Sequence, residues 1–307
     1  MNTRSILASL LGLASVLTAE VTLQLPKPVQ AEPSVVRRRA QITGINEKIR
    51  AARLQPARLR PIDITKLIVL GPEIFMDLRS AINGYQLPVR DQGPRGTCSV
   101  HALAFCQEYM TCQKQNQTGL NHSVEYLNWA GNVVLGQPYH DGGFYADLDK
   151  GYQAYGALPE MSAPYQASFN SSWAPTVKNV STGQQATRHT AVFIKSWDNT
   201  KGASQAQLND ALAHLKLKRP VALGALWPNN LQVQSVDGVD LMVVPSRAAT
   251  FDGHSVVLVG YHKSAKYPGG GYFIFRNSWG KNWGDNGYGH MPFKYVLDLA
   301  NDLLVYK

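Results

Sequence analysis

The feature that most constrains the fold of this chain is a change of hydrophobic pattern near its middle. In the first half, apolar residues recur at the spacing of helices, most clearly over residues 98–113. In the second half, short β-branched and aromatic runs, such as AVFIK, HSVVLVGY and YFIFR, are separated by Gly, Pro and Asn. The first pattern predicts helices and the second predicts strands. Because the two kinds of segment are separated along the chain, we expect an α+β fold with two lobes.

Four segments have the spacing or the end signals of helices. In residues 98–113 the apolar positions cover most of the helix circumference, which predicts a buried central helix. Residues 123–134 and 144–156 follow, the second ended by Gly156, and residues 204–218 begin at Ser204, a good N-cap residue. We therefore place the helical lobe at about 98–190 and the β-rich lobe at about 191–307.

The first 73 residues differ in composition from the rest of the chain. Arg4, the apolar stretch 6–17 and the small-residue pattern at 29–31 are typical of a secretory signal peptide, which we place at residues 1–31. An uncleaved anchor, or cleavage at Ala19, is the alternative. Residues 32–73 form a basic pro-region or N-terminal arm, with one possible short helix at 44–54. The globular domain is then 74–307, and we expect a secreted, periplasmic or extracellular protein.

The net charge of +9 is concentrated in this arm. Positions 37–66 carry nine Lys and Arg residues against two acidic residues, so residues 67–307 hold a net charge of only +2. A nearly neutral globular part argues against a nucleic-acid partner. No later stretch is apolar enough to cross a bilayer, so we expect no membrane contact beyond the signal segment.

The three cysteines are too far apart along the predicted central helix to pair. At about 1.5 Å of rise per residue, Cys106 and Cys112 are separated by about 9 Å, and Cys98 lies farther away. A disulfide needs Cα atoms within about 7 Å of each other. We therefore expect no disulfide, with Cys106 and Cys112 as small apolar core residues.

Cys98 occupies a different position, directly after the glycine-rich turn QGPRGT and at the start of the helix. Helix amides and a neighbouring imidazolium lower the pKa of a thiol. His254 begins an apolar strand, and Asn277 follows another strand just before Trp279. The side-chain oxygen of an Asn can orient an imidazole toward a thiol, which is the arrangement of nucleophile, base and orienting group in covalent catalysis.

These segments, taken together, resemble the papain-like cysteine proteases. The matching motifs follow the order of that family: DQGPRGTC, DGGFYADLDKGYQAYG, GHSVVLVGY and NSWGKNWGDNGYG. The resemblance spans about residues 77–306. It implies a papain-like two-lobed fold, in which the active site lies between a helical lobe and a β-barrel-like lobe.

The resemblance also implies roles for individual residues. Cys98 would be the nucleophile, His254 the base and Asn277 its orienting partner, with Gln92 in the oxyanion hole. Gly142 and Gly143 would form a wall along which a substrate backbone pairs. Trp279 would cover the His254–Asn277 pair and would, with the two glycines, be a substrate-binding residue. No cofactor or metal is implied. The chain departs from the usual family pattern at Ser99, where tryptophan is common, and at Arg95, where a disulfide cysteine is common.

We therefore predict a secreted cysteine peptidase that hydrolyses peptide bonds through an acyl-enzyme, acts on peptides or proteins, and is a monomer. His101, three residues after Cys98, is an alternative base on nearly the same helix face. Two other functions remain open. One is a non-catalytic relative that binds peptides or proteins, and the other is a thiol amidase or transpeptidase acting on another amide.

Overall fold

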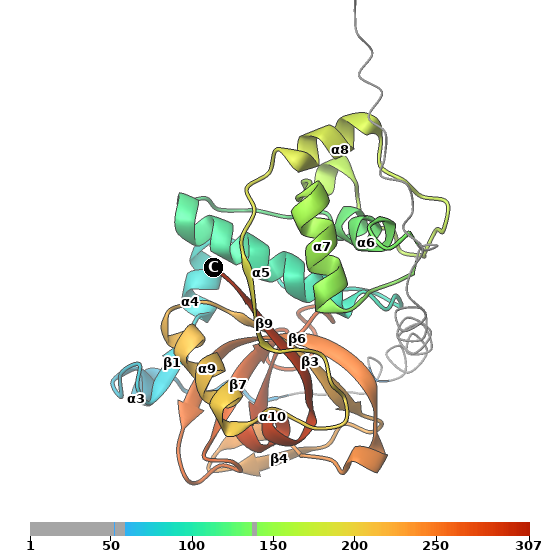
Figure 1. The fold of residues 1–307 in the computed structure, drawn as a ribbon. Helices are drawn as coiled ribbons and strands as arrows, with labels where there is room; N and C mark the ends of the chain where they lie inside the picture. Colours follow the sequence, from blue (N-terminus) through green and yellow to red (C-terminus); the bar gives the residue numbers. More distant parts are fainter. Residues whose placement is uncertain (1–51, 53–58, 137–139) are drawn as a thin grey trace, which may run out of the picture.

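The helices between residues 98 and 184 lie apart from the strands in space as they do along the chain, whereas two later helices, at residues 205–216 and 293–299, lie with the strands (Figure 1). The structure, a computed structural model, describes residues 52, 59–136 and 140–307. The predicted signal peptide 1–31 lies outside these residues, as does the possible helix 44–54 apart from Ala52. None of the helices in the described part of the chain is long and apolar enough to cross a membrane.

The helical lobe is built around one buried helix. This helix, α5 (Cys98–Gln115), is buried from Cys98 through Cys112 and ends at Asn116, which adopts a left-handed conformation. Around it lie α6 (Val124–Val133), α7 (Tyr145–Tyr155) and α8 (Val177–Gln184). In Figure 1, α5 runs along the boundary between the two lobes. A helix that is apolar over most of its circumference can be buried on all sides, as the sequence predicts.

The β-rich lobe contains an antiparallel sheet of seven strands that curls around helix α10 (Figure 1). The strand order is β2-β9-β3-β6-β7-β8, and β1 also pairs with β6. The strands are β1 (Phe75–Asp77), β2 (Ala191–Lys195), β3 (Val221–Pro228), β6 (Thr250–Lys263), β7 (Gly271–Arg276), β8 (Tyr288–Pro292) and β9 (Ala300–Tyr306). Strands β4 (Val233–Val236) and β5 (Val239–Met242) form a separate hairpin.

Short elements complete the two lobes. Helices α9 (Gln205–Lys216) and α10 (Phe293–Leu299) pack on the sheet, and α4 (Arg79–Gly84) follows β1. The remaining elements are single turns: α3 (Thr65–Ile68), η1 (Glu160–Ser162) and η2 (Arg247–Ala249). The α9 helix begins as predicted, because Ser204 and Gln207 form a reciprocal capping box.

The described end of the N-terminal arm packs on the β-rich lobe. Leu59 is buried, and Ile62, Ile64 and Leu67 pack against the main hydrophobic core. The Arg60 guanidinium binds the Asp240 carboxylate on β5, with nitrogen–oxygen distances of 2.6–3.2 Å. The domain boundary between residues 73 and 74 stays a prediction, but residues 59–73 are in contact with the domain that follows them.

All three cysteines are free thiols, as their spacing predicts. We therefore expect the midpoint of thermal unfolding to be the same with and without dithiothreitol. Loss of a native disulfide from a small domain typically costs about 2–5 kcal/mol, which such a melt detects easily. A clear fall of the midpoint on reduction would contradict the absence of disulfides.

Candidate active site

Cys98 is the first residue of α5 and lies where that helix meets β6. Its side chain is 5% exposed, and the backbone amides of Ser255 and Ser99 stabilise the thiolate form. Because Ser255 directly follows His254 on β6, the sulfur lies beside the histidine segment, although about 150 residues separate the two in sequence. The structure therefore brings Cys98 and the His254 strand together across the boundary between the lobes.

The His254 ring is enclosed by one amide and two tryptophans. Its Nε2 atom lies 2.8 Å from Asn277 Oδ1. The Trp279 ring stacks on it at a centroid distance of 4.5 Å, and Trp227 approaches it edge-on at 4.6 Å. The ring is fully buried, and its Nδ1 atom has no hydrogen-bond partner among the described residues. Asn277 therefore holds one ring nitrogen and leaves the other one unpaired.

Burial has the largest effect on the pKa values of the Cys98 thiol and the His254 imidazole. Burial raises the pKa of Cys98 to about 11, and hydrogen bonds from Ser255 and Ser99 only partly oppose this rise. Burial lowers the pKa of His254 to about 4, against the opposite effect of the hydrogen bond to Asn277. The amides of Ser99 and Ser255 lower the pKa of Cys98, as the position at the start of the helix predicts, but desolvation of the thiolate has the larger effect and the net shift is upward. Without a substrate, burial therefore favours the thiol form of Cys98 and the neutral form of the His254 imidazole.

Gln92 is completely buried between the two lobes. Its side-chain Nε2 donates to the Arg95 carbonyl at 2.7 Å, and its Oε1 accepts from Ser278 Oγ at 2.7 Å. Its backbone amide also donates to the Ser278 carbonyl, at 2.8 Å. Ser278 is adjacent to Asn277. The same short segment therefore positions the Gln92 side chain and the partner of His254.

The Gly142–Gly143 segment is fixed against residues 92–97, the loop that leads into the predicted nucleophile Cys98 and is called the nucleophile loop below. The Gly142 amide donates to Asn128 Oδ1 at 3.0 Å, and the Gly143 amide donates to Ser99 Oγ at 3.1 Å. Gly142 has a φ of +73°, and a Cβ there would lie 2.4 Å from the Gly96 carbonyl oxygen. Glycine at position 142 is therefore required by the protein's own backbone, which the sequence alone did not indicate.

Residues 73–297 match the sequence profile described as papain family cysteine protease. This chain belongs to the papain family. The papain-family protease is 26% identical over 242 residues to an uncharacterized peptidase C1-like protein of Acanthamoeba polyphaga mimivirus, and the match covers 75% of this chain and 73% of the viral protein. It is 26% identical over 214 residues to a senescence-specific cysteine protease of Oryza sativa subsp. indica, covering 67% of this chain and 54% of the rice protein.

Solved structures show the same fold as this papain-family protease. Xylellain, a cysteine protease from Xylella fastidiosa, gives a TM-score of 0.59 at 22% identity and covers 82% of this chain and 95% of its own. The digestive procathepsin L 3 of Tenebrio molitor gives a TM-score of 0.55 at 17% identity, covering 89% and 87%. The α+β papain-like fold is thus confirmed, and family membership makes this chain a cysteine-type peptidase, a hydrolase.

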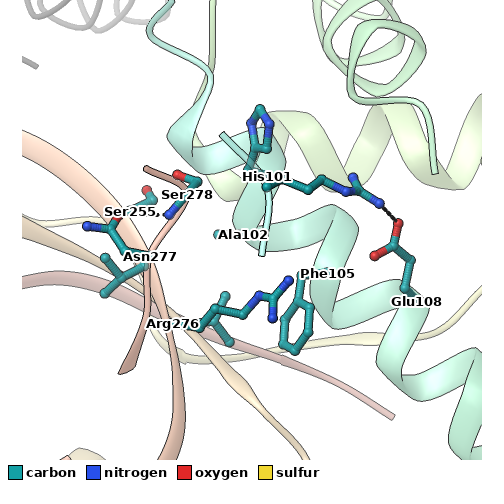
Figure 2. A pocket seen from close by; sticks show the side chains of 11 residues that line it. His101, Ala102, Phe105, Glu108, Ser255, Arg276, Asn277 and Ser278 are labelled. Atoms are coloured by element: carbon teal, nitrogen blue, oxygen red, sulfur yellow. Dashed lines mark hydrogen bonds and ion pairs between the residues drawn. The ribbon is translucent and has the colours of Figure 1, made fainter. Parts of the chain in front are cut away.

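In this papain-family protease, His101 is part of the packing around the site. Its Nδ1 lies 3.0 Å from the Thr97 carbonyl, and its ring packs edge-on against Tyr165. Burial lowers the pKa of His101 to about 3. Figure 2 shows His101, Arg276 and Glu108 around a small pocket between α5 and the strands. Arg90, which also lines this pocket, forms a partly buried ion pair with Glu108. His101 is therefore a poorer candidate for the base than His254.

Among the described residues, no group of three or more His, Cys, Asp or Glu side chains is placed to hold a metal ion. The sequence analysis did not anticipate Ser255, which contacts the thiol, or Asn128, which holds Gly142. Neither residue carries a motif signal, because each is defined only by contacts between segments distant in the sequence.

Gly142→Ala is expected to destabilise the papain-family protease by about 3 kcal/mol, because it combines left-handed strain with a clash against the Gly96 carbonyl. Gly143→Ala is the matched control, since its Cβ would meet only Leu148 side-chain atoms at 3.4 Å or more. Urea unfolding of both variants checks this. Equal stabilities of the two variants would contradict the close approach of Gly142 to the nucleophile loop.

Proposed function

We propose that this protease hydrolyses peptide bonds with Cys98 as the nucleophile, His254 as the general base and acid, and Asn277 as its orienting partner. The observation that carries the proposal is the state of the His254 ring. Asn277 accepts at one ring nitrogen, and the other has no partner among the described residues, at the point where β6 meets Cys98. An imidazole held in this way can exchange a proton with a neighbouring thiol.

In the proposed first step, the Cys98 sulfur attacks the substrate carbonyl carbon as its proton passes to His254 Nδ1. The electron pair of the C=O bond moves to oxygen, and the Gln92 amide and the Cys98 backbone N–H stabilise that oxyanion. Only one of the two Gln92 Nε2 protons is needed for the Arg95 carbonyl, so the second one can face the oxyanion.

In the second step, the imidazolium of His254 donates its proton to the leaving amine, and the C–N bond breaks to give a thioester on Cys98. His254 then takes a proton from water while the water oxygen attacks the thioester carbonyl. The C–S bond breaks, the acid product leaves and the thiol regains its proton. Trp279, stacked on the His254 ring, keeps water from the hydrogen bond between His254 and Asn277.

The low pKa of His254 suits the acid part of this cycle. A buried imidazolium is a strong acid, because burial disfavours its charge. It therefore returns its proton readily to a leaving amine. The hydrogen bond from Nε2–H to Asn277 keeps the charged state accessible during the step.

Gly142 and Gly143 are proposed to line the path of the substrate backbone, because they lie beside the nucleophile loop. We further propose that the substrates are peptides or proteins, that the enzyme works as a monomer, and that it is secreted to a periplasmic or extracellular location. The secretion proposal rests on the signal-like sequence at 1–31.

Digestion of a peptide library by the full chain, followed by mass spectrometry of the products, tests the proposal. Hydrolysis gives fragments that end in a free carboxyl group and supports it. Fragments joined to an added amine acceptor would instead identify a transpeptidase. An intact library, under conditions in which a known papain-family protease cleaves it, would identify a non-catalytic binding protein.

A further inference from the structure

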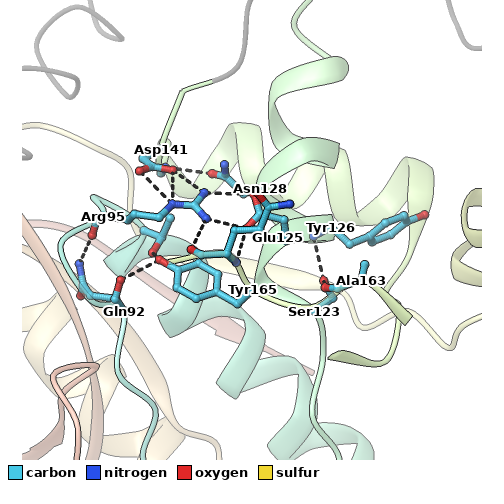
Figure 3. A network of polar contacts seen from close by, with 12 residues as sticks. Gln92, Arg95, Ser123, Glu125, Tyr126, Asn128, Asp141, Ala163 and Tyr165 are labelled. Atoms are coloured by element: carbon cyan, nitrogen blue, oxygen red, sulfur yellow. Dashed lines mark hydrogen bonds and ion pairs between the residues drawn. The ribbon is translucent and has the colours of Figure 1, made fainter. Parts of the chain in front are cut away.

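Arg95, three residues before Cys98, occupies a buried cage of acceptors beneath the nucleophile loop (Figure 3). Its side chain is 3% exposed. Nε and Nη2 bind the Asp141 carboxylate at 2.7–3.2 Å, and Nη1 and Nη2 bind the Glu125 carboxylate at 2.6 and 3.2 Å. Nη1 also donates to the Gln166 carbonyl at 2.9 Å. A guanidinium has five N–H groups, and these contacts use all of them.

The cage joins three segments that are distant in the sequence. Arg95 belongs to the nucleophile loop, Glu125 to α6, and Asp141 directly precedes Gly142. The α6 helix also supplies Asn128, which accepts from the Gly142 amide. The side chain of Arg95 therefore holds the glycine segment, while its backbone carbonyl holds the Gln92 amide at 2.7 Å.

An aromatic ring closes the cage on the side of the nucleophile loop. The Arg95 guanidinium lies 4.6 Å from the centroid of the Tyr165 ring. The Tyr165 hydroxyl donates to the Gln92 carbonyl at 2.8 Å and accepts from Thr97 Oγ1 at 2.6 Å. Both ends of the loop between Gln92 and Cys98 are thus fastened to one ring that stacks on the arginine.

The geometry of the cage requires an arginine. Two carboxylates, a carbonyl and a ring face surround one planar group, and only a guanidinium presents a flat fork of five donors. A lysine would carry the same charge with three donors on a single atom, and could not reach both carboxylates in the same plane. Because no N–H group is left over and the side chain is buried, Arg95 itself is not placed to bind a substrate.

We propose that Arg95 is a positioning residue for the hydrolysis proposed above, on which this inference rests. Through Asp141 and Glu125 it fixes the Gly142–Gly143 segment, and through its own carbonyl it fixes the Gln92 amide, both relative to Cys98. The ionic cage thereby links the nucleophile loop to α6 and to the glycine segment without a covalent bond.

The test compares Arg95→Lys with Arg79→Lys in the full chain. Arg79 is the matched control, because it also binds two carboxylates, those of Asp77 and Asp285 at 2.8 and 3.1 Å, and is only 17% exposed. None of its hydrogen bonds involves Gln92, Gly142 or Gly143 among the described residues. Five quantities are measured: kcat and KM for a peptide substrate, the affinity for a peptide aldehyde inhibitor, the pH profile of Cys98 alkylation by iodoacetamide, and the midpoint of thermal unfolding.

For Arg95→Lys we expect kcat and the affinity for the aldehyde to fall roughly 10- to 100-fold, because the oxyanion donor is displaced. We expect KM to rise by about threefold or more, because the Gly142–Gly143 segment that is proposed to line the substrate path loses its support. We expect the alkylation profile to match wild type, because the Cys98–His254 pair is untouched. Arg79→Lys should keep kcat within about twofold of the wild-type value, even if its midpoint of thermal unfolding falls as much as that of Arg95→Lys. Should Arg95→Lys not fold, Asp141→Asn replaces it in the same assays.

Three results would overturn the positioning role. The first is an Arg95→Lys variant with wild-type kcat, and the second is an equal loss of kcat in Arg79→Lys and Arg95→Lys, which would make the cage purely structural. The third is an altered alkylation profile, which would place the effect on the thiol itself. A wild-type chain that cleaves no peptide overturns the proposed hydrolysis and this inference with it, and is distinct from all three.

Discussion

Cys98→Ala is expected to lower kcat/KM for peptide hydrolysis by roughly 10⁶-fold, because the Cys98 sulfur is the group that forms the acyl-enzyme in the proposed mechanism. The change removes one buried sulfur, so the fold should persist and the variant should still bind peptides. Hydrolysis of a fluorogenic peptide, with circular dichroism as the check on folding, measures the effect.

Cys106→Ala is the matched control for this substitution. Cys106 lies on the same helix and is fully buried, but its sulfur contacts the Pro220 carbonyl at 3.9 Å and the Ala222 backbone, away from His254 and Ser255 on β6. Its loss should cost about 1 kcal/mol of stability and leave kcat/KM within about twofold. If Cys98→Ala kept most of its activity while Cys106→Ala lost it, the nucleophile would be misassigned.

His254→Ala is expected to lower kcat by about 10⁴-fold, because the same ring must accept the thiol proton and later protonate the leaving amine. The comparison is with His101→Ala, which removes the other histidine near Cys98. His101 binds the Thr97 carbonyl and has a pKa lowered by burial to about 3, so its loss should reduce kcat by less than about tenfold. Stopped-flow and steady-state assays on both variants measure the two effects.

The reverse pattern would show that His101 is the base. A loss of kcat of equal size in both variants would mean that neither histidine acts alone, and that the pair of Cys98 with His254 is not the reacting unit. Both variants remove the same imidazole from a buried position. A general loss of stability would therefore affect both variants and would not by itself lower kcat in His254→Ala alone.

Elements with local signals are predictable from the sequence. The α5 helix has apolar residues around its circumference, and α9 carries its own capping box, so both appear close to their predicted bounds. The β8 strand, YGHMP, has no such signal. It exists because it pairs with β7, and because Gly289 leaves room for the Phe275 ring, whose nearest atom would lie 2.4 Å from a Cβ at that position. Such elements depend on tertiary neighbours and are invisible to local patterns.

The apolar run LMVV at residues 241–244, whose composition is that of a strand, illustrates the same limit. The structure places β5 at Val239–Met242, two residues earlier, because it forms a hairpin with β4 across the turn at Asp237 and Gly238. A short apolar run indicates a strand, but the turn that pairs it with its neighbour sets its register.

The site, too, combines residues that have a local sequence signal with features that depend on tertiary contacts. Cys98, His254 and Asn277 lie in recognisable local motifs, and the structure brings their segments together. The direction of their pKa shifts was not predictable, because it depends on burial by both lobes. The Arg95 cage was equally hidden, since its carboxylates lie 30 and 46 residues away in sequence.

The acyl-enzyme itself is the most direct test of the account. The full chain is mixed with a slowly hydrolysed peptide ester, quenched in acid and digested, and the modified fragment is identified by mass spectrometry. We predict that the acyl group is found on the fragment that carries Cys98, and that it is absent from the Cys98→Ala variant. An acyl group on Cys106, on Cys112 or on no cysteine, in a chain that still turns over the ester, would contradict the proposed mechanism.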